Sequence, residues 1–296
     1  MRGAVIPITM VPGDSPIHKI APLPKLAWSF GVLIISFMTR NPAILGTIIL
    51  SGLILTTIAK LWKPMLKVMI ILFPIYVITI FLQSVAPAFP KPWTEIIGFG
   101  PFTIFQEGIY SGITMFGRAL GMTIFAMVTI MTTHPSDLFA SLEKIGMPYV
   151  LNFILTVTLQ LIPILQREFT TVLSAQKSRG MKGTGFGAVL PSMVPVFVGA
   201  IERVQQLSIS LESRAFGSTG KKTSYRNVVM RAKDYVILVT GMLASLATGY
   251  WIIVDKSLDW SRTMTFTPAL ALTLVITSMV IFISFISIAV FKILKA

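Results

Sequence analysis

The chain of 296 residues is 54% hydrophobic and only 12% charged, and its formal net charge is +14. Several runs of about 17 to 25 residues carry almost no charge, which is the length that crosses a bilayer, so the composition excludes an ordinary soluble domain and predicts a polytopic membrane protein. Cysteine is absent, and His18 and His134 are the only histidines, which excludes disulfides and thiolate chemistry and predicts neither a metal site nor a cofactor.

Six apolar segments have the length and composition of transmembrane helices. They cover residues 25–39, 42–60, 66–86, 109–131, 234–254 and 266–291. No apolar stretch with a small-residue cleavage site precedes the first of them. We therefore expect no signal peptide, and we expect the first span to direct its own insertion.

The basic residues predict the orientation of these spans. With the N-terminus inside, 20 lysines and arginines fall on the cytoplasmic side, and the outer loops keep four, Arg40, Lys91, Lys256 and Arg262. Cytoplasmic segments of membrane proteins are enriched in Lys and Arg. The pattern thus predicts that both termini and the segment 132–233 face the cytoplasm, and it explains the net charge without nucleic acid.

The segment 132–233 separates the first four spans (residues 1–131) from the C-terminal spans (234–296). It begins with a short helix near Pro135, and two long helices follow over about 148–180 and 188–216. At 1.5 Å per residue, each is about 45 Å long.

The first halves of the two long helices are apolar, but we do not expect them to cross the membrane. A crossing at "YVLNFILTVTLQLIPIL", residues 149–165, would place Arg167, Lys177 and Arg179 outside, against the orientation rule. The second halves become amphipathic, with apolar residues at helical spacing. We expect the two helices to pack on one another or on the spans as a cytoplasmic appendage.

Motifs that would make the chain an enzyme are missing or fail. "GSTGKKT" (Gly217 to Thr223) resembles a phosphate-binding loop, but position 215 is alanine, position 222 is lysine and no strand precedes it. No carboxylate pair lies in an apolar segment. We therefore predict that the chain neither binds nor hydrolyses ATP.

Arg118 is the one charge well inside a predicted span. A charge at this depth is costly, so it marks either a functional site or a structural contact such as a backbone carbonyl. Gly117 and Gly121 flank it in a G-x-x-x-G spacing that permits close helix approach. The pattern favours packing over substrate contact.

Two similar triads end the long helices. Ser178-Arg179-Gly180 ends the first, and Ser213-Arg214-Ala215 ends the second. Arginines in these places can simply be cations at helix C-termini, with Gly180 and Gly217 as caps. Alternatively, a fixed charge between two small residues suits docking into a partner, because arginine can form a fork of hydrogen bonds. The residues alone leave both interpretations open.

These motifs resemble the T component (EcfT or CbiQ type) of energy-coupling factor (ECF) transporters. The likeness lies in "GDSPIHKIAPLPKL" at the N-terminus and in the tract from His134 to Gly217, and it is weaker in the spans. Ala21 departs from the pattern, because the family usually has Asp there. The last predicted span, 266–291, extends beyond the shortest family members.

The resemblance implies an all-α membrane scaffold with about six transmembrane helices and two cytoplasmic coupling helices. It implies that Arg179 and Arg214 each insert into a groove on one of two ABC-type ATPase subunits. The flanking residues that it implies for this contact are Ser178, Gly180, Ser213 and Ala215, with Ala175 and Gln176 before the first triad.

The function implied is ATP-driven import of a micronutrient, a vitamin or a transition-metal ion, across a prokaryotic cell membrane. The scaffold would also hold a small membrane-embedded substrate-binding (S) subunit. The alternatives are a self-contained secondary transporter of a small solute, which calls for inverted repeats with broken helices, and a membrane enzyme, which calls for catalytic residues that we do not find.

Overall fold

The computed structural model of the chain describes residues 10–88, 93–99, 102–180, 186–218, 220 and 230–254. They divide into two compact units: unit 1 comprises Met1–Leu138 with Val229–Ala296, and unit 2 comprises Phe139–Val228. The sixth predicted span, 266–291, lies outside the described residues.

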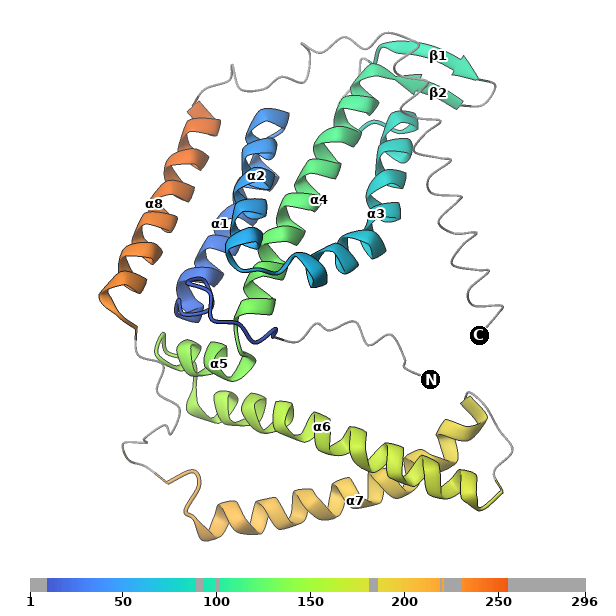
Figure 1. Cartoon of the computed structure of the whole chain (residues 1–296), viewed down its shortest axis with the longest axis vertical. Helices are drawn as coiled ribbons and strands as arrows, with labels where there is room; N and C mark the ends of the chain where they lie inside the picture. Colours follow the sequence, from blue (N-terminus) through green and yellow to red (C-terminus); the bar gives the residue numbers. More distant parts are fainter. Residues whose placement is uncertain are drawn as a thin grey trace. The chain divides into compact units, whose positions relative to one another are not determined.

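Unit 1 holds helices at the positions expected for the first five spans (Figure 1). They are α1 (Pro22–Met38), α2 (Pro42–Ile58), α3 (Trp62–Val85), α4 (Gln106–Thr132) and α8 (Ala232–Val254). Of these, α3, α4 and α8 are long and apolar enough to cross a membrane, whereas α1 and α2 are shorter apolar helices of 17 residues. The all-α membrane fold is confirmed.

Local sequence explains where several of these helices begin and bend. Proline occupies the first position of α1 and of α2, where its missing N–H costs no hydrogen bond. The Asn41 side chain caps α2 by accepting a hydrogen bond from the Ala43 N–H at 2.9 Å. Pro74 lies inside α3, and Figure 1 shows that this helix is bent, as expected where a proline interrupts the hydrogen-bond ladder.

A small β-hairpin between α3 and α4 was not predicted from the sequence. Strand β1 (Glu95–Phe99) pairs antiparallel with β2 (Phe102–Phe105). The Trp93 ring packs against the Phe105 ring with centroids 5.1 Å apart. Strands of four and five residues are too short for periodicity to distinguish them from an irregular outer loop.

Helix α4 is the centre of unit 1 and contacts α1, α2 and α3. The closest contacts of α4 with α2 and α3 occur at glycines. A Cβ built at Gly108 would lie 2.4 Å from the Gln83 carbonyl oxygen on α3. A Cβ at Gly121 would lie 3.1 Å from Ile48 on α2. Backbones can pack this closely only where a side chain is missing.

The N-terminal arm is anchored to the end of α4. The Val11 N–H donates to the Met131 carbonyl at 2.9 Å, and Ile17 is buried in a cluster with Met65 and Met131. Within the arm, His18 Nε2 lies 3.0 Å from the Val11 carbonyl oxygen. The arm therefore belongs to the packed structure of unit 1.

One carboxylate joins the starts of α1 and α8. Asp234 is buried, and its two oxygens accept hydrogen bonds from the backbone N–H of Ala21 (3.1 Å) and of Arg231 (2.9 Å). Both N–H groups are at helix N-caps, where a carboxylate is favourable. Asp234 thus supplies an acidic cap at α1, where position 21 itself offers no side-chain acceptor.

Unit 2 is an antiparallel pair of long helices, α6 (Tyr149–Ser178) and α7 (Phe186–Ser213). The short helix α5 (Pro135–Glu143) precedes them. As expected for a capped start, the Ser136 N–H donates to His134 Nδ1 at 3.2 Å. By length and composition alone, α6 also qualifies as a candidate span.

Candidate coupling site

The first triad forms the end of α6. Ser178 is the last helical residue and its hydroxyl donates to the Ser174 carbonyl at 3.1 Å. Arg179 is the C-cap, and its N–H donates to the Ala175 carbonyl at 3.1 Å. Gly180 follows with φ = +88°, a left-handed conformation that glycine adopts without strain.

The second triad forms the end of α7 in the same way. Ser213 is the last helical residue and its hydroxyl donates to the Ser210 carbonyl at 2.9 Å. Arg214 follows at the cap, and Ala215 then adopts φ = +54°. Its N–H donates to the Glu212 carbonyl (2.9 Å), and the Phe216 N–H donates to the Leu211 carbonyl (2.9 Å). This pair of bonds is the Schellman ending of a helix.

The capping residue at this second end differs from expectation. Gly217 does have a positive φ, +96°, but the first left-handed residue after α7 is Ala215. A Cβ in this region costs about 1–2 kcal/mol. The alanine therefore adopts at some cost the conformation that Gly180 adopts freely, and the two ends match in geometry as well as in sequence.

Both arginines project from these helix ends as exposed side chains. Arg179, Arg214 and their flanking residues Ser178, Gly180, Ser213 and Ala215 are all exposed. Within the described part of the chain, no carboxylate pairs with either guanidinium. Each guanidinium is thus free to donate several hydrogen bonds to a second molecule.

Packing within unit 2 holds the two arginines far apart. Phe216 follows the second triad and contacts Phe153 near the start of α6, with ring centroids 4.5 Å apart; Tyr149 completes the aromatic cluster. Arg214 therefore lies near the start of α6 and Arg179 lies at its end. From Phe153 to Arg179 the chain advances 26 residues along α6, so the separation is about 40 Å at 1.5 Å per residue.

An ion pair joins the middles of the two helices. Arg203 on α7 donates both terminal nitrogens to the Glu168 carboxylate on α6, with one N–O distance of 3.2 Å. The hydrogen bond from Arg203 lowers the pKa of Glu168. Both side chains are about one-third exposed, so the pair fixes the register of the crossing more than it adds stability.

Arg118 contacts the backbone rather than a carboxylate. Its Nε and Nη2 donate to the Thr39 carbonyl at 3.1 Å and 2.6 Å, at the C-terminal end of α1. Beside it, Gly117 faces Leu45 and Gly121 faces Ile48, both on α2. These three residues therefore pack α4 onto α1 and α2.

Sequence reasoning missed the contacts that shape the site. The aromatic cluster joins residues about 65 positions apart, and the Glu168–Arg203 pair joins residues 35 positions apart. The signal that the sequence did offer was Phe216, an apolar residue two positions after the cap arginine, where Schellman endings often carry one. The stretch 219–223, apart from Gly220, lies outside the described residues.

Comparison with known proteins identifies the family of the chain. The family model CbiQ, described as cobalt transport protein, matches residues 13–225. The energy-coupling factor transporter transmembrane protein EcfT of Staphylococcus aureus is 27% identical over 254 residues, which cover 80% of this chain and 93% of the relative. The EcfT of Bacillus subtilis is 28% identical over 247 residues, covering 78% and 91%. The chain therefore belongs to the CbiQ family and is a transmembrane (T) component of the ECF type.

Proposed function

We propose that this chain is the scaffold of an ATP-driven micronutrient importer and that it couples two ABC-type ATPase subunits to a small membrane-embedded substrate-binding subunit. The observation that carries the proposal is the shared geometry of the two triads. Each places a serine at the last helical residue, an exposed arginine at the cap and a small residue in the left-handed region.

This geometry suits insertion into a groove. The left-handed residue turns the chain away directly after the arginine, so the guanidinium stands at the tip of the helix. The small flanking residues let the partner's backbone approach, and each serine hydroxyl is already satisfied by its own helix. A buried fork from arginine to carboxylate or carbonyl oxygens supplies both specificity and affinity.

Two tips about 40 Å apart suit two docking partners, one for each arginine. When ATP closes the ATPase pair, its two grooves approach one another and pull on the ends of α6 and α7. The aromatic cluster and the Glu168–Arg203 pair transmit that pull between α6 and α7. In the proposed mechanism, the surface of α6 and α7 that holds the substrate-binding subunit then changes shape.

The apolar surface of unit 2 is the proposed contact for that subunit. Several large side chains on α7 are more than half exposed, including Val194, Phe197 (68%) and Val204. A soluble surface rarely shows such a continuous apolar face unless it binds a partner or a membrane.

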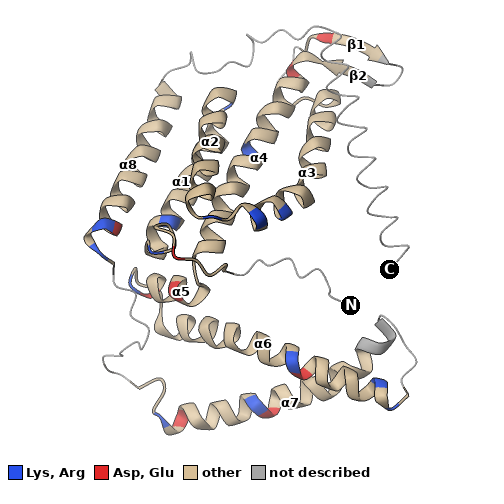
Figure 2. Cartoon of the chain, viewed as in Figure 1, with Lys and Arg blue, Asp and Glu red and all other residues tan. Residues whose placement is uncertain are grey.

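The charges of unit 1 support a proposed orientation in the membrane. Basic residues cluster at the N-terminal ends of α1, α3 and α8, which lie at one end of the unit, and the β-hairpin lies at the other (Figure 2). The residues of the basic end are Lys19, Lys25, Lys60, Lys63, Lys67, Arg231 and Lys233. We assign this end to the cytoplasm, which leaves α6 on the cytoplasmic side in spite of its length and apolar character.

Labelling tests this orientation. Because the chain has no cysteine, single cysteines can be introduced as Lys63→Cys at the basic end and Glu95→Cys in the hairpin; both sites are exposed. An impermeant maleimide added to intact cells should modify only Glu95→Cys. Modification of Lys63→Cys in sealed cells would contradict the orientation.

Purification tests the proposed assembly. From cells that express its partner genes, the chain in mild detergent should bring down two ATPase chains and one small membrane protein. Purified alone, it should show no saturable ATP binding. A chain that transports its solute in vesicles without any ATPase would instead be the secondary transporter considered from the sequence.

A further inference from the structure

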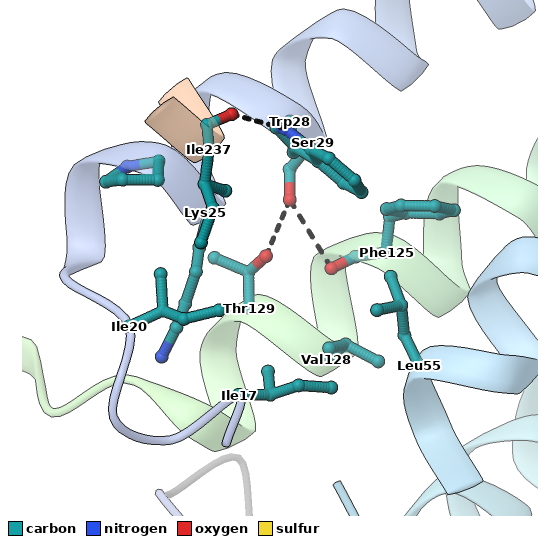
Figure 3. A pocket seen from close by; sticks show the side chains of 11 residues that line it. Ile17, Ile20, Lys25, Trp28, Ser29, Leu55, Phe125, Val128, Thr129 and Ile237 are labelled. Atoms are coloured by element: carbon teal, nitrogen blue, oxygen red, sulfur yellow. Dashed lines mark hydrogen bonds between the residues drawn. The ribbon is translucent and has the colours of Figure 1, made fainter. Parts of the chain in front are cut away.

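A pocket of about 210 Å³ lies in unit 1 between α1, α2, α4 and α8 (Figure 3). Its deep wall is formed by Phe125 and Val128 on α4, which are buried. Trp28 on α1 is 37% exposed, and Ile237 on α8 and Leu55 on α2 are partly exposed. The pocket therefore opens toward the surroundings of the helices rather than being sealed in the core.

The chemistry of the wall disfavours water as the occupant. Eight of the eleven lining residues are apolar. The Ser29 and Thr129 hydroxyls bond to one another at 2.6 Å, and the Trp28 indole N–H donates to the Ile237 carbonyl at 3.2 Å. A water molecule needs two to four polar partners, and apolar cavities without them stay dry. An apolar chain is the occupant that this wall suits.

Exposed cations lie at the starts of α1 and α8, close in sequence to the lining residues Ile20 and Ile237, and we call this basic edge the rim of the pocket. The Asp234 carboxylate bridges the backbone of Ala21 and Arg231, so the starts of α1 and α8 lie together. Lys19, Arg231 and Lys233 flank this bridge and are exposed. Lys233 stands four residues before Ile237, on the same face of α8 as this wall residue.

Lys25 also lines the pocket, and Figure 3 shows its side chain running along the wall. Its ammonium donates to the Thr132 carbonyl at 3.0 Å and lies 3.5 Å from the Thr133 hydroxyl. The ammonium is thereby held against the C-terminal end of α4, within electrostatic range of the Asp234 and Asp137 carboxylates.

We propose that this pocket binds one anionic phospholipid, with an acyl chain between α1, α4 and α8 and its phosphate among the cations of the rim. Two features select this occupant: an apolar cleft open to the hydrocarbon, and a basic cluster at one membrane surface. Basic pockets between transmembrane helices on the cytoplasmic side are suited to anionic headgroups. The assignment to the inner leaflet rests on the orientation proposed above, but binding itself needs neither ATPase nor substrate-binding subunit.

The test is native mass spectrometry of the purified full chain with dioleoyl-phosphatidylglycerol or dioleoyl-phosphatidylcholine added. The wild-type chain should retain one phosphatidylglycerol and much less phosphatidylcholine. Leu55→Trp and Ile237→Trp fill the pocket and should each weaken retention about tenfold or more, since each buried methylene contributes roughly fourfold in affinity. Leu50→Trp and Val239→Trp are matched controls on the exposed faces of α2 and α8 and should leave retention unchanged.

The headgroup contact is tested by charge. Arg231→Gln with Lys233→Gln should weaken phosphatidylglycerol binding roughly 25-fold, because each cation near a membrane surface contributes about fivefold. Lys63→Gln with Lys67→Gln removes the same charge at the same end but away from the pocket, and should change little. The proposal is overturned if the two pocket-filling variants retain lipid as their controls do. It is also overturned if both charge variants behave alike, or if the wild type shows no preference for phosphatidylglycerol.

Discussion

The Arg179→Ala variant is expected to lose one of the two ATPase subunits, and Arg214→Ala to lose the other. Truncating a buried, hydrogen-bonded charge costs about 2–5 kcal/mol, because its partner is left unpaired. That loss corresponds to roughly 30- to 5,000-fold weaker docking. The measurement is the ratio of ATPase chains to scaffold in complexes purified in mild detergent, together with transport in vesicles.

Lysine substitutions at both tips, and an alanine substitution of another exposed arginine, serve as controls for this prediction. Arg179→Lys and Arg214→Lys should restore docking only partly, since lysine keeps the charge but lacks the planar fork. Arg167→Ala removes an exposed arginine from the middle of α6 and should keep both ATPases. If the tip arginines only stabilise their helix ends, their removal costs about 0.3–1 kcal/mol, and both ATPases remain in every variant.

The Gly108→Ala variant is expected to be strongly destabilised. The new Cβ would lie 2.4 Å from the Gln83 carbonyl oxygen and 2.8 Å from the Ser84 carbonyl oxygen. Both atoms belong to the backbone of α3 and cannot rotate away, so α4 must shift relative to α3. Overpacking of this kind costs about 3 kcal/mol, and we expect a clear fall in the temperature of thermal unfolding in detergent.

Gly46→Ala is the matched control, because it makes the same chemical change within α2. A Cβ at Gly46 would meet nothing within 4 Å, and alanine is favoured over glycine inside a helix by about 1 kcal/mol. The unfolding temperature of this variant should stay the same or rise. Equal unfolding temperatures for Gly46→Ala and Gly108→Ala would show that α3 and α4 do not approach as closely as described.

Most of the helices could be predicted from the sequence because their signals are local. Apolar runs fixed the positions of α1, α2, α3, α4 and α8 to within a few residues, and the two long patterns predicted α6 and α7. The positions of charged residues and prolines, which predict orientation and helix starts, are also read directly from the local sequence. For this reason the membrane class, the helix order and the family were all predicted before any contact was known.

The remaining features depend on residues that are distant in sequence. Nothing near Asp234 indicates that its carboxylate caps α1 as well as α8, and nothing near Phe216 names Phe153 as its neighbour. The left-handed conformation of Ala215 was also not predictable, because alanine seldom adopts it. These contacts appear only when the chain folds back on itself.

Site-specific cross-linking tests the central claim most directly, because it identifies the protein that each arginine tip contacts in native membrane preparations. Ser178→Cys and Ser213→Cys place a single thiol beside Arg179 and Arg214 in a chain without other cysteines, and Arg167→Cys serves as the control on α6. With a short thiol-to-amine cross-linker in native membranes, each tip should form an adduct with one ATPase chain, and the control should form none. The absence of an ATPase adduct at both tips, in membranes that still transport, would contradict the account.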